Sequence, residues 1–243
     1  RYKTLENGDS LALHIFKPRN MQAGEKRPVI VYFFGGGWKL GTPLQFYREC
    51  AYYASKGMVA VSVDYRIEYL HHSTPFDSFE DAKDAICWLR SHASDYQLDP
   101  DKIAVAGGSA GGHLAAALGT IGSDEAVNYR PNLSVLYYPV VDMVSRGYGF
   151  PEIKRDFEKI SPIHHVSEAT PSTLILLGTK DPIVSVETIR SYQDKLLQKG
   201  VDCELHLFEG AGHPIFLYRK PLTEDYYKVR KLTDDFLKRQ GFL

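Results

Sequence analysis

The sequence predicts an α/β fold, in which a mostly parallel central sheet carries helices on both of its faces. Segments typical of strands alternate with segments typical of helices along most of the chain, as in parallel sheets with crossover helices. Two strand segments, Pro28–Phe34 and Met58–Asp64, are apolar runs typical of strands buried on both faces. The 243 residues, 44% of them hydrophobic, fit one domain over residues 1–243.

Apolar periodicity and the residues at segment ends place the individual elements in order. The predicted strands are Leu11–Phe16, Pro28–Phe34, Met58–Asp64, Lys102–Ala106, Leu133–Tyr138, Thr173–Leu177 and Val201–Phe208. The predicted helices are Leu44–Ser55, Asp77–His92, Ala110–Gly119, Ser185–Lys199 and Leu222–Lys238. In the second helix, apolar residues recur at helical spacing, and Asp77 or Ser78 is the expected N-cap. The fourth helix ends at Gly200, which can adopt the left-handed backbone that closes a helix.

Charge and composition exclude several classes of partner. The 29 basic and 30 acidic residues are scattered and leave a net charge of -1, so nothing favours nucleic acid or an anionic membrane. No apolar run is long enough for a transmembrane helix. The three cysteines, Cys50, Cys87 and Cys203, form no zinc or disulfide spacing, and we expect them to be small buried apolar residues.

The chain begins at Arg1 rather than Met, which indicates a trimmed or processed chain. We therefore expect a soluble protein that is either cytoplasmic or secreted or periplasmic after loss of a signal peptide. The sequence leaves the oligomeric state open.

A glycine-rich turn after the predicted strand at 102–106 is a candidate nucleophile site. It contains the pattern Gly-x-Ser-x-Gly around Ser109 and is followed by a helix. A sharp strand-to-helix elbow leaves no room for flanking side chains, hence Gly107 and Gly111, and it exposes the serine hydroxyl above the sheet. The pattern alone also suits a phosphate-cradling turn, but the elements around it favour a nucleophile.

A serine hydroxyl needs a base, and the base needs an orienting acid. Asp181 follows the predicted strand at 173–177, and His213 follows the one at 201–208. The order Ser109, Asp181, His213 is the order expected in a sheet with this elbow. Asp142 is the competing acid, and an Asp-Pro turn is the alternative role of Asp181.

The other histidines predict no metal site. His71-His72 and His164-His165 are adjacent pairs rather than the spaced pairs that zinc sites use. His113 starts a helix, where we expect it to pack or cap. We predict no metal and no other cofactor.

Three glycines and a tryptophan, Gly35-Gly36-Gly37-Trp38, follow the strand at 28–34. Successive glycines let backbone amides approach a tetrahedral intermediate, and the amide of Ala110 would complete the donor set. A flexible glycine turn is the alternative interpretation. Trp38 and the 16 tyrosines could form a surface that stacks on sugar or aryl rings, or could be core packing.

Taken together, these segments resemble the α/β-hydrolase fold, and within it the hormone-sensitive-lipase-like esterases and the acetyl xylan and feruloyl esterases. The matching pieces, in order, are FFGGGW at 33–38, VDYR at 63–66, PFDSFEDA at 75–82, GGSAGGHLA at 107–115, SPIHHV at 161–166, GTKDPIV at 178–184 and GAGHPIF at 210–216. The resemblance implies carboxylic-ester hydrolysis, with Gly36 and Gly37 as oxyanion donors beside Ala110, and it favours Asp181 over Asp142.

The sequence departs from this family in two places. Phe34 stands where the family's glycine motif begins with His, and we expect a re-packed loop with activity retained. Only residues 1–34 precede the loop in this sequence, so we expect the family's helical cap to be minimal or absent, with residues 140–171 as the one other place for a small lid. An open site suits a short acyl group, such as acetyl, displayed on a bulky carbohydrate.

The sequence thus predicts a serine carboxylesterase that acts on a small-molecule or carbohydrate-linked ester. The alternatives are a lipase-like enzyme, a peptidase or acyltransferase on the same fold, or a binding protein that retains a hydrolase scaffold.

Overall fold

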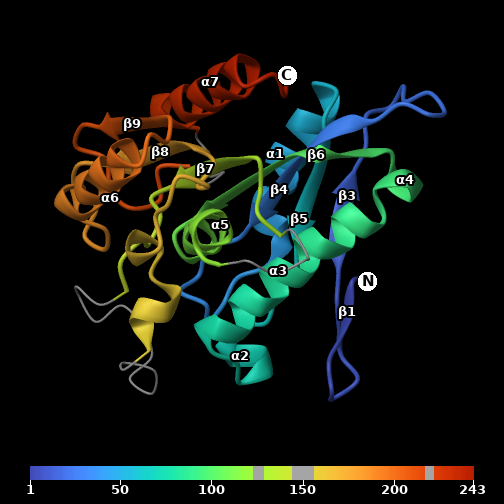
Figure 1. The fold of residues 1–243 in the computed structure, drawn as a ribbon, viewed down its shortest axis with the longest axis horizontal. Coiled ribbons are helices and arrows are strands. Elements are labelled where there is room, and N and C mark those ends of the chain that lie inside the picture. The colour runs from blue at the N-terminus through green and yellow to red at the C-terminus, as the bar shows by residue number, and fades with distance from the viewer. Residues whose placement is uncertain (123–128, 144–155, 217–221) are drawn as a thin grey trace.

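A seven-stranded sheet forms the centre of the computed structural model, which describes residues 1–122, 129–143, 156–216 and 222–243 (Figure 1). The strand order is β3-β5-β4-β6-β7-β8-β9. The strands are β3 Leu13–Phe16, β4 Arg27–Phe33, β5 Val59–Val63, β6 Leu98–Gly108, β7 Leu133–Tyr137, β8 Ser172–Gly178 and β9 Cys203–Phe208. Strand β3 runs antiparallel to β5, and the other neighbouring strands are parallel. The predicted mostly parallel sheet is confirmed.

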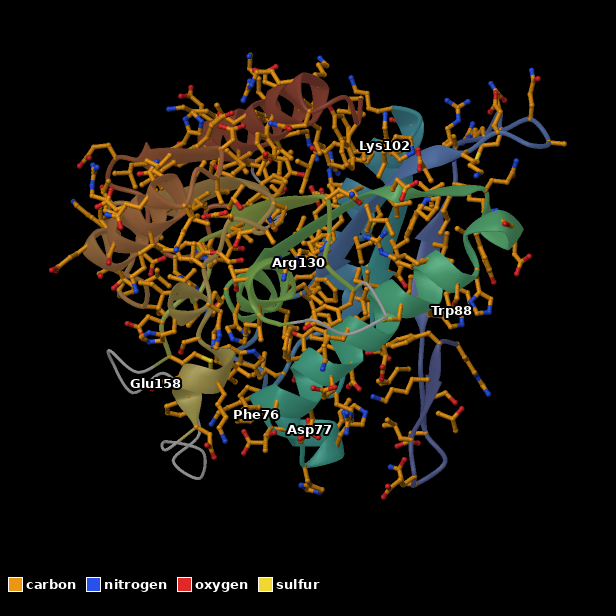
Figure 2. All side chains as sticks on the ribbon, in the orientation of Figure 1. Phe76, Asp77, Trp88, Lys102, Arg130 and Glu158 are labelled. Carbon is orange, nitrogen blue, oxygen red and sulfur yellow. The ribbon has the colours of Figure 1, made fainter. Side chains whose placement is uncertain are left out.

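Helices cover both faces of this sheet, as predicted. They are α1 Tyr47–Ser55, α2 Glu68–His71, α3 Pro75–Ser91, α4 Ala93–Tyr96, α5 Ala110–Thr120, α6 Val186–Gln198 and α7 Glu224–Arg239. In Figure 1, α3 and α5 lie side by side in front of the sheet. On the other face, Arg230 of α7 bonds Glu49 of α1 at 3.0 Å. The residues between the helices and the sheet fill the interior in Figure 2. Strand β5 is wholly buried, as are residues 29–33 of β4 and 103–108 of β6.

Two of the predicted elements begin differently in the structure. The segment Leu11–Phe16 is divided between β3 and a short strand β2, Ser10–Leu11, which pairs with β1, Lys3–Thr4. The helix expected from Leu44 begins as a 3-10 turn over Pro43–Phe46.

The N-cap of α3 is Thr74, so the prediction of Asp77 or Ser78 was wrong. The Thr74 side chain accepts a hydrogen bond from the Asp77 amide, and the Asp77 carboxylate accepts one from the Thr74 amide. This capping box satisfies amides at the helix start, and Pro75 supplies a backbone already suited to the first helical position. Figure 2 labels Asp77 near this end of α3 and Trp88 near the other.

The three cysteines are free, and Cys50 and Cys203 are buried as expected, whereas Cys87 is only partly buried. Among the described residues, no helix is long and apolar enough to cross a membrane. Part of the segment 140–171, where a small lid was expected, lies outside the described residues, namely 144–155. The described remainder includes two 3-10 turns, Phe157–Ile160 and Pro162–His164.

Candidate active site

Ser109 lies between β6 and α5, at the carboxyl end of the central strand. Its backbone has φ 56° and ψ -118°, a conformation that a residue with a side chain rarely adopts. A Cβ added at Gly107 would lie 2.3 Å from the Gly111 carbonyl oxygen, and one at Gly111 would lie 2.0 Å from that of Phe33. The elbow therefore requires both glycines, for the steric reason expected from the sequence.

The structure brings Ser109, His213 and Asp181 into one chain of hydrogen bonds. His213 Nε2 lies 2.8 Å from Ser109 Oγ, and His213 Nδ1 lies 2.7 Å from Asp181 Oδ2. The other carboxylate oxygen of Asp181 accepts hydrogen bonds from the amides of Ile183 and Val184, at 2.8 and 2.9 Å. With Nδ1 donating to the carboxylate, Nε2 is left to accept a proton from the serine.

Burial strengthens this arrangement. The Asp181 side chain is fully buried, and that of His213 is 13% exposed. Three hydrogen bonds satisfy the buried carboxylate, so its position is fixed relative to the imidazole. Asp181, rather than the competing Asp142, holds the imidazole of His213.

The glycine loop follows β4, next to Ser109 at the same edge of the sheet. Among the residues that the structure describes, none accepts a hydrogen bond from the amides of Gly36 and Gly37. The amide of Ala110 is the first of α5, and helix geometry gives such an amide no acceptor within the helix. Within the described part of the chain, the amides of all three predicted oxyanion donors are therefore without an acceptor, and they lie on the glycine loop and directly after the serine.

Phe34 is fully buried, and its ring stacks on that of Tyr65 with 4.0 Å between centroids. The Tyr65 hydroxyl donates to the Phe34 carbonyl at 2.6 Å. A side chain at Gly41 would meet the Phe34 ring at 2.6 Å, so the loop closes around the phenyl group. The ring of Phe34 thus packs against the base of the glycine loop. That the enzyme keeps its activity with Phe34 at this position stays a prediction.

Sequence reasoning missed Gln45, whose side-chain amide holds Gly35 at both ends. The Gly35 amide donates to Gln45 Oε1 at 2.8 Å, and Gln45 Nε2 donates to the Gly35 carbonyl at 3.1 Å. Gln45 lies in a 3-10 turn ten residues beyond the glycine, and no local pattern in the sequence signals such a pairing.

Trp38 and His113 pack against each other beneath the site. Trp38 is 1% exposed, and its ring meets that of His113 edge-on at 5.1 Å. Trp38 therefore offers no surface for stacking on a substrate. His113 Nε2 donates to the Ile160 carbonyl at 2.6 Å, and burial lowers the pKa of its imidazole to about 4. His113 packs, as predicted. No cluster suited to holding a metal ion occurs among the described residues.

Comparison with known proteins places this chain in a family. The family model BD-FAE matches residues 13–149. Esterase LipC of Mycobacterium tuberculosis is 30% identical over 83% of this chain and 56% of its own length. An acetylxylan esterase of Xylanibacter ruminicola is 25% identical over 79% of this chain and 42% of its own. The chain spans about half the length of the curated relatives it matches.

Solved structures match along the whole chain. A thermophilic esterase from the Planctomycetes species Thermogutta terrifontis is 38% identical, with a TM-score of 0.92, over 100% of this chain and 91% of that one. A second structure, of Thermogutta terrifontis esterase 2 phosphorylated by paraoxon, is 39% identical over 100% of this chain and 93% of that one, with a TM-score of 0.92. The chain therefore belongs to the BD-FAE family of α/β-hydrolase serine esterases, which are of the hormone-sensitive-lipase-like type.

Proposed function

We propose that this protein hydrolyses carboxylic esters through an acyl-enzyme on Ser109. The observation that carries the proposal is the continuous Asp181–His213–Ser109 hydrogen-bond chain, with distances of 2.7 and 2.8 Å. Membership of the BD-FAE family and the esterase relatives support the same chemistry.

In the first half of the reaction, Ser109 Oγ attacks the ester carbonyl carbon while its proton moves to His213 Nε2. The carbonyl oxygen becomes an oxyanion held by the amides of Gly36, Gly37 and Ala110, and each such donor is worth about 10²- to 10³-fold in rate. The bond to the leaving alcohol then breaks, and His213 returns the proton to the alcohol oxygen. Asp181 keeps Nδ1 protonated and stabilises the imidazolium.

In the second half, His213 takes a proton from water, and the resulting hydroxide attacks the acyl carbon. The second tetrahedral intermediate collapses, Ser109 Oγ regains its proton from His213, and the carboxylic acid leaves. Water thus supplies the hydroxyl group of the carboxylic acid and the proton that restores Ser109.

For the substrate we propose short acyl esters, such as acetyl groups on carbohydrate. The similarity to the acetylxylan esterase supports this class, as do solved structures of the Thermogutta terrifontis esterase with propionate or butyrate bound. Beside the glycine loop, Tyr69 is 81% exposed and Leu40 is 62% exposed. The Tyr69 amide donates to the Lys39 carbonyl, so this exposed aromatic residue is attached next to the loop, and we propose that its ring stacks on a sugar ring of the substrate.

The test of the chemistry is turnover of 4-nitrophenyl acetate. Ser109→Ala is expected to lower kcat at least about 10⁴-fold, because the nucleophile is lost while binding remains. Ser94→Ala, at an exposed serine on the remote helix α4, is the matched control and should retain wild-type kcat. Equal kcat in Ser109→Ala and wild type would refute the proposal.

The test of the substrate is a panel of nitrophenyl esters of rising chain length, acetylated xylan, methyl ferulate and a peptide anilide. We expect kcat/KM to fall as the acyl chain lengthens and to be high on acetylated xylan. Constant kcat/KM to long chains would instead favour a lipase-like site, and cleavage of the anilide would favour a peptidase.

A further inference from the structure

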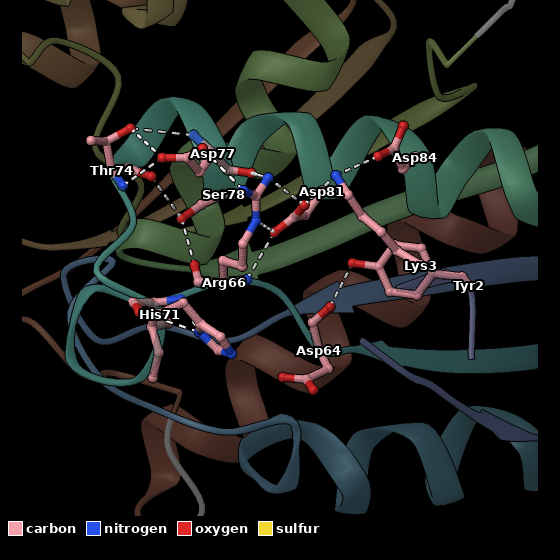
Figure 3. Close-up of polar contacts among 11 residues, drawn as sticks. Tyr2, Lys3, Asp64, Arg66, His71, Thr74, Asp77, Ser78, Asp81 and Asp84 are labelled. Atoms are coloured by element: carbon pink, nitrogen blue, oxygen red, sulfur yellow. Dashed lines mark hydrogen bonds and ion pairs between the residues drawn. The ribbon is translucent and has the colours of Figure 1, made fainter. Parts of the chain in front are cut away.

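Arg66 and Asp81 form a buried, doubly bonded ion pair just beyond the end of β5 (Figure 3). Arg66 Nε and Nη2 donate to the two carboxylate oxygens of Asp81, both at 2.8 Å, and the Arg66 amide donates to Oδ2 at 2.9 Å. The Asp81 side chain is fully buried on α3, so these hydrogen bonds replace the water that its carboxylate has lost. Lys3 Nζ adds a further contact to Asp81 at 2.6 Å.

Both the backbone and the side chain of Arg66 are bonded to α3. Ser78 Oγ donates to the Arg66 carbonyl at 2.8 Å, and Arg66 Nη1 donates to the Asp77 carboxylate at 3.1 Å. Figure 3 shows the guanidinium between Asp77 and Asp81 along one side of the helix. The chain at residue 66 thus has one position relative to α3.

The next residues connect this point to the glycine loop. Glu68 is the first residue of α2, and its amide donates to the Trp38 carbonyl at 2.9 Å. The Tyr69 amide donates to the Lys39 carbonyl at 3.1 Å. Two consecutive amides after Arg66 therefore hold two consecutive carbonyls of the loop.

The glycine loop needs hydrogen bonds from outside itself, because part of its backbone has an unfavourable conformation. Trp38 has a left-handed φ of 59°, which follows a left-handed Gly37 at 64°. Such a conformation at a bulky residue persists only where the surroundings hold it. Within the loop, the Gly36 carbonyl accepts hydrogen bonds from the amides of Lys39 and Leu40, so residues 36–40 form one tight turn. The bonds to α2 fix where that turn sits.

We propose that Arg66 is a positioning residue for the oxyanion hole. Through Asp81 it ties the start of α2 to α3, and α2 then sets the direction of the Gly36 and Gly37 amides. The inference rests on the proposed function. It assigns to Arg66 an effect on the transition state rather than on substrate binding, since the oxyanion exists only after attack.

The sharpest test is a single hydrogen bond, removed by Glu68→Pro. Proline lacks the amide that holds Trp38, yet it suits the first position of a helix, and Ile67 before it is already extended at φ -127° and ψ 150°. Glu68→Ala is the matched control, because it removes the same side chain and its ion pair with Lys39 but keeps the amide.

Arg66→Met tests the ion pair itself, with Arg230→Met as its control. Arg230 pairs with Glu49 at 3.0 Å between α7 and α1, with burial similar to that of the Arg66–Asp81 pair, but on the opposite face of the sheet from α3. For both Glu68→Pro and Arg66→Met we expect kcat on 4-nitrophenyl acetate to fall about 10- to 100-fold with KM within about 2-fold of wild type. The inhibition constant of phenylboronic acid, which forms a tetrahedral adduct on serine, should rise by a similar factor.

In Arg230→Met we expect a lower melting temperature but an unchanged kcat. This control shows whether a general loss of stability is enough to lower kcat, or whether the Gly36 and Gly37 amides must be displaced. If Arg66→Met does not fold, the kcat of Glu68→Pro relative to that of Glu68→Ala becomes the test. Wild-type kcat in folded Arg66→Met or in folded Glu68→Pro, or equal loss in Glu68→Ala, would overturn the inference while leaving the proposed function intact. If turnover does not depend on Ser109, both fall together.

Discussion

At Ser109 the chain reverses from a buried strand into a buried helix within one residue. The left-handed backbone there is held by the Tyr137 carbonyl, which accepts from the serine amide at 3.1 Å, and by the His113 amide, which donates to the serine carbonyl at 2.9 Å. Space for the turn comes from the glycines around it. Because these contacts fix the backbone at Ser109, they also fix the direction in which its hydroxyl points toward His213.

Gly111→Ala tests this residue-scale argument. Its new Cβ would lie 2.0 Å from the Phe33 carbonyl oxygen and 2.5 Å from that of Phe34, and neither backbone can move without disturbing β4. We expect the free energy of unfolding to fall by about 3 kcal/mol, as in overpacked cores.

Urea unfolding measures this loss, and Gly212→Ala provides the control. At Gly212 an added Cβ meets nothing within 4 Å, so the expected change is about 0.5 kcal/mol or less. Similar losses in the two variants would contradict the steric explanation.

At the scale of elements, α3 supports the site from a distance. Its first turn carries the Thr74 capping box, and the next turn carries Asp81, which pairs with Arg66. Because Asp77 both closes the capping box and contacts the Arg66 guanidinium, the start of the helix and the ion pair share one residue.

Thr74→Ala is expected to lower the free energy of unfolding by about 1 kcal/mol, because the amide of Asp77 loses its acceptor. Thr74→Ser keeps the hydroxyl and should stay close to wild type. Thermal or urea unfolding distinguishes the two, and an unchanged stability in Thr74→Ala would show that the cap contributes nothing measurable.

At the scale of the whole molecule, the parallel sheet brings the residues of the candidate site together at one edge. The loops after β4, β6, β8 and β9 all lie at the carboxyl edge, so the glycine loop, Ser109, Asp181 and His213 meet although they are far apart in the chain. Helix α5 packs behind this edge with every residue buried, and one of those residues, His113, is ionisable.

Burial of His113 predicts a pH dependence of global stability. Its imidazole has a pKa of about 4 in the folded protein against 6.5 when unperturbed. Between these values the unfolded chain binds a proton that the folded protein does not, so stability falls as the pH is lowered. From pH 7 to pH 5 this group should remove about 2 kcal/mol from the free energy of unfolding.

Comparing wild type with His113→Asn isolates that contribution from other titrating groups. The variant is expected to be less stable at pH 7, but its loss between pH 7 and pH 5 should be smaller by about 2 kcal/mol. Parallel pH profiles for the two proteins would rule out His113 as the source.

Much of the fold and of the candidate site could be predicted from sequence because their signals are local. Apolar runs marked the buried strands, and the glycines at 107 and 111 marked an elbow whose steric demand the structure shows directly. The N-cap of α3 was misplaced because three neighbouring residues, Thr74, Asp77 and Ser78, all suit a cap, and hydrogen-bond geometry chooses among them.

The sequence alone determined the fold class and the order of the strands and helices, and it made Ser109 and His213 the candidate nucleophile and base, since each depends on patterns of a few neighbouring residues. The tertiary structure decided which acid holds His213, that Trp38 is buried on His113, that Gln45 and Tyr65 fasten the glycine loop, and that Arg66 reaches this loop through α2. These contacts join segments that are distant in the chain. Their geometry exists only after the sheet has brought the segments together.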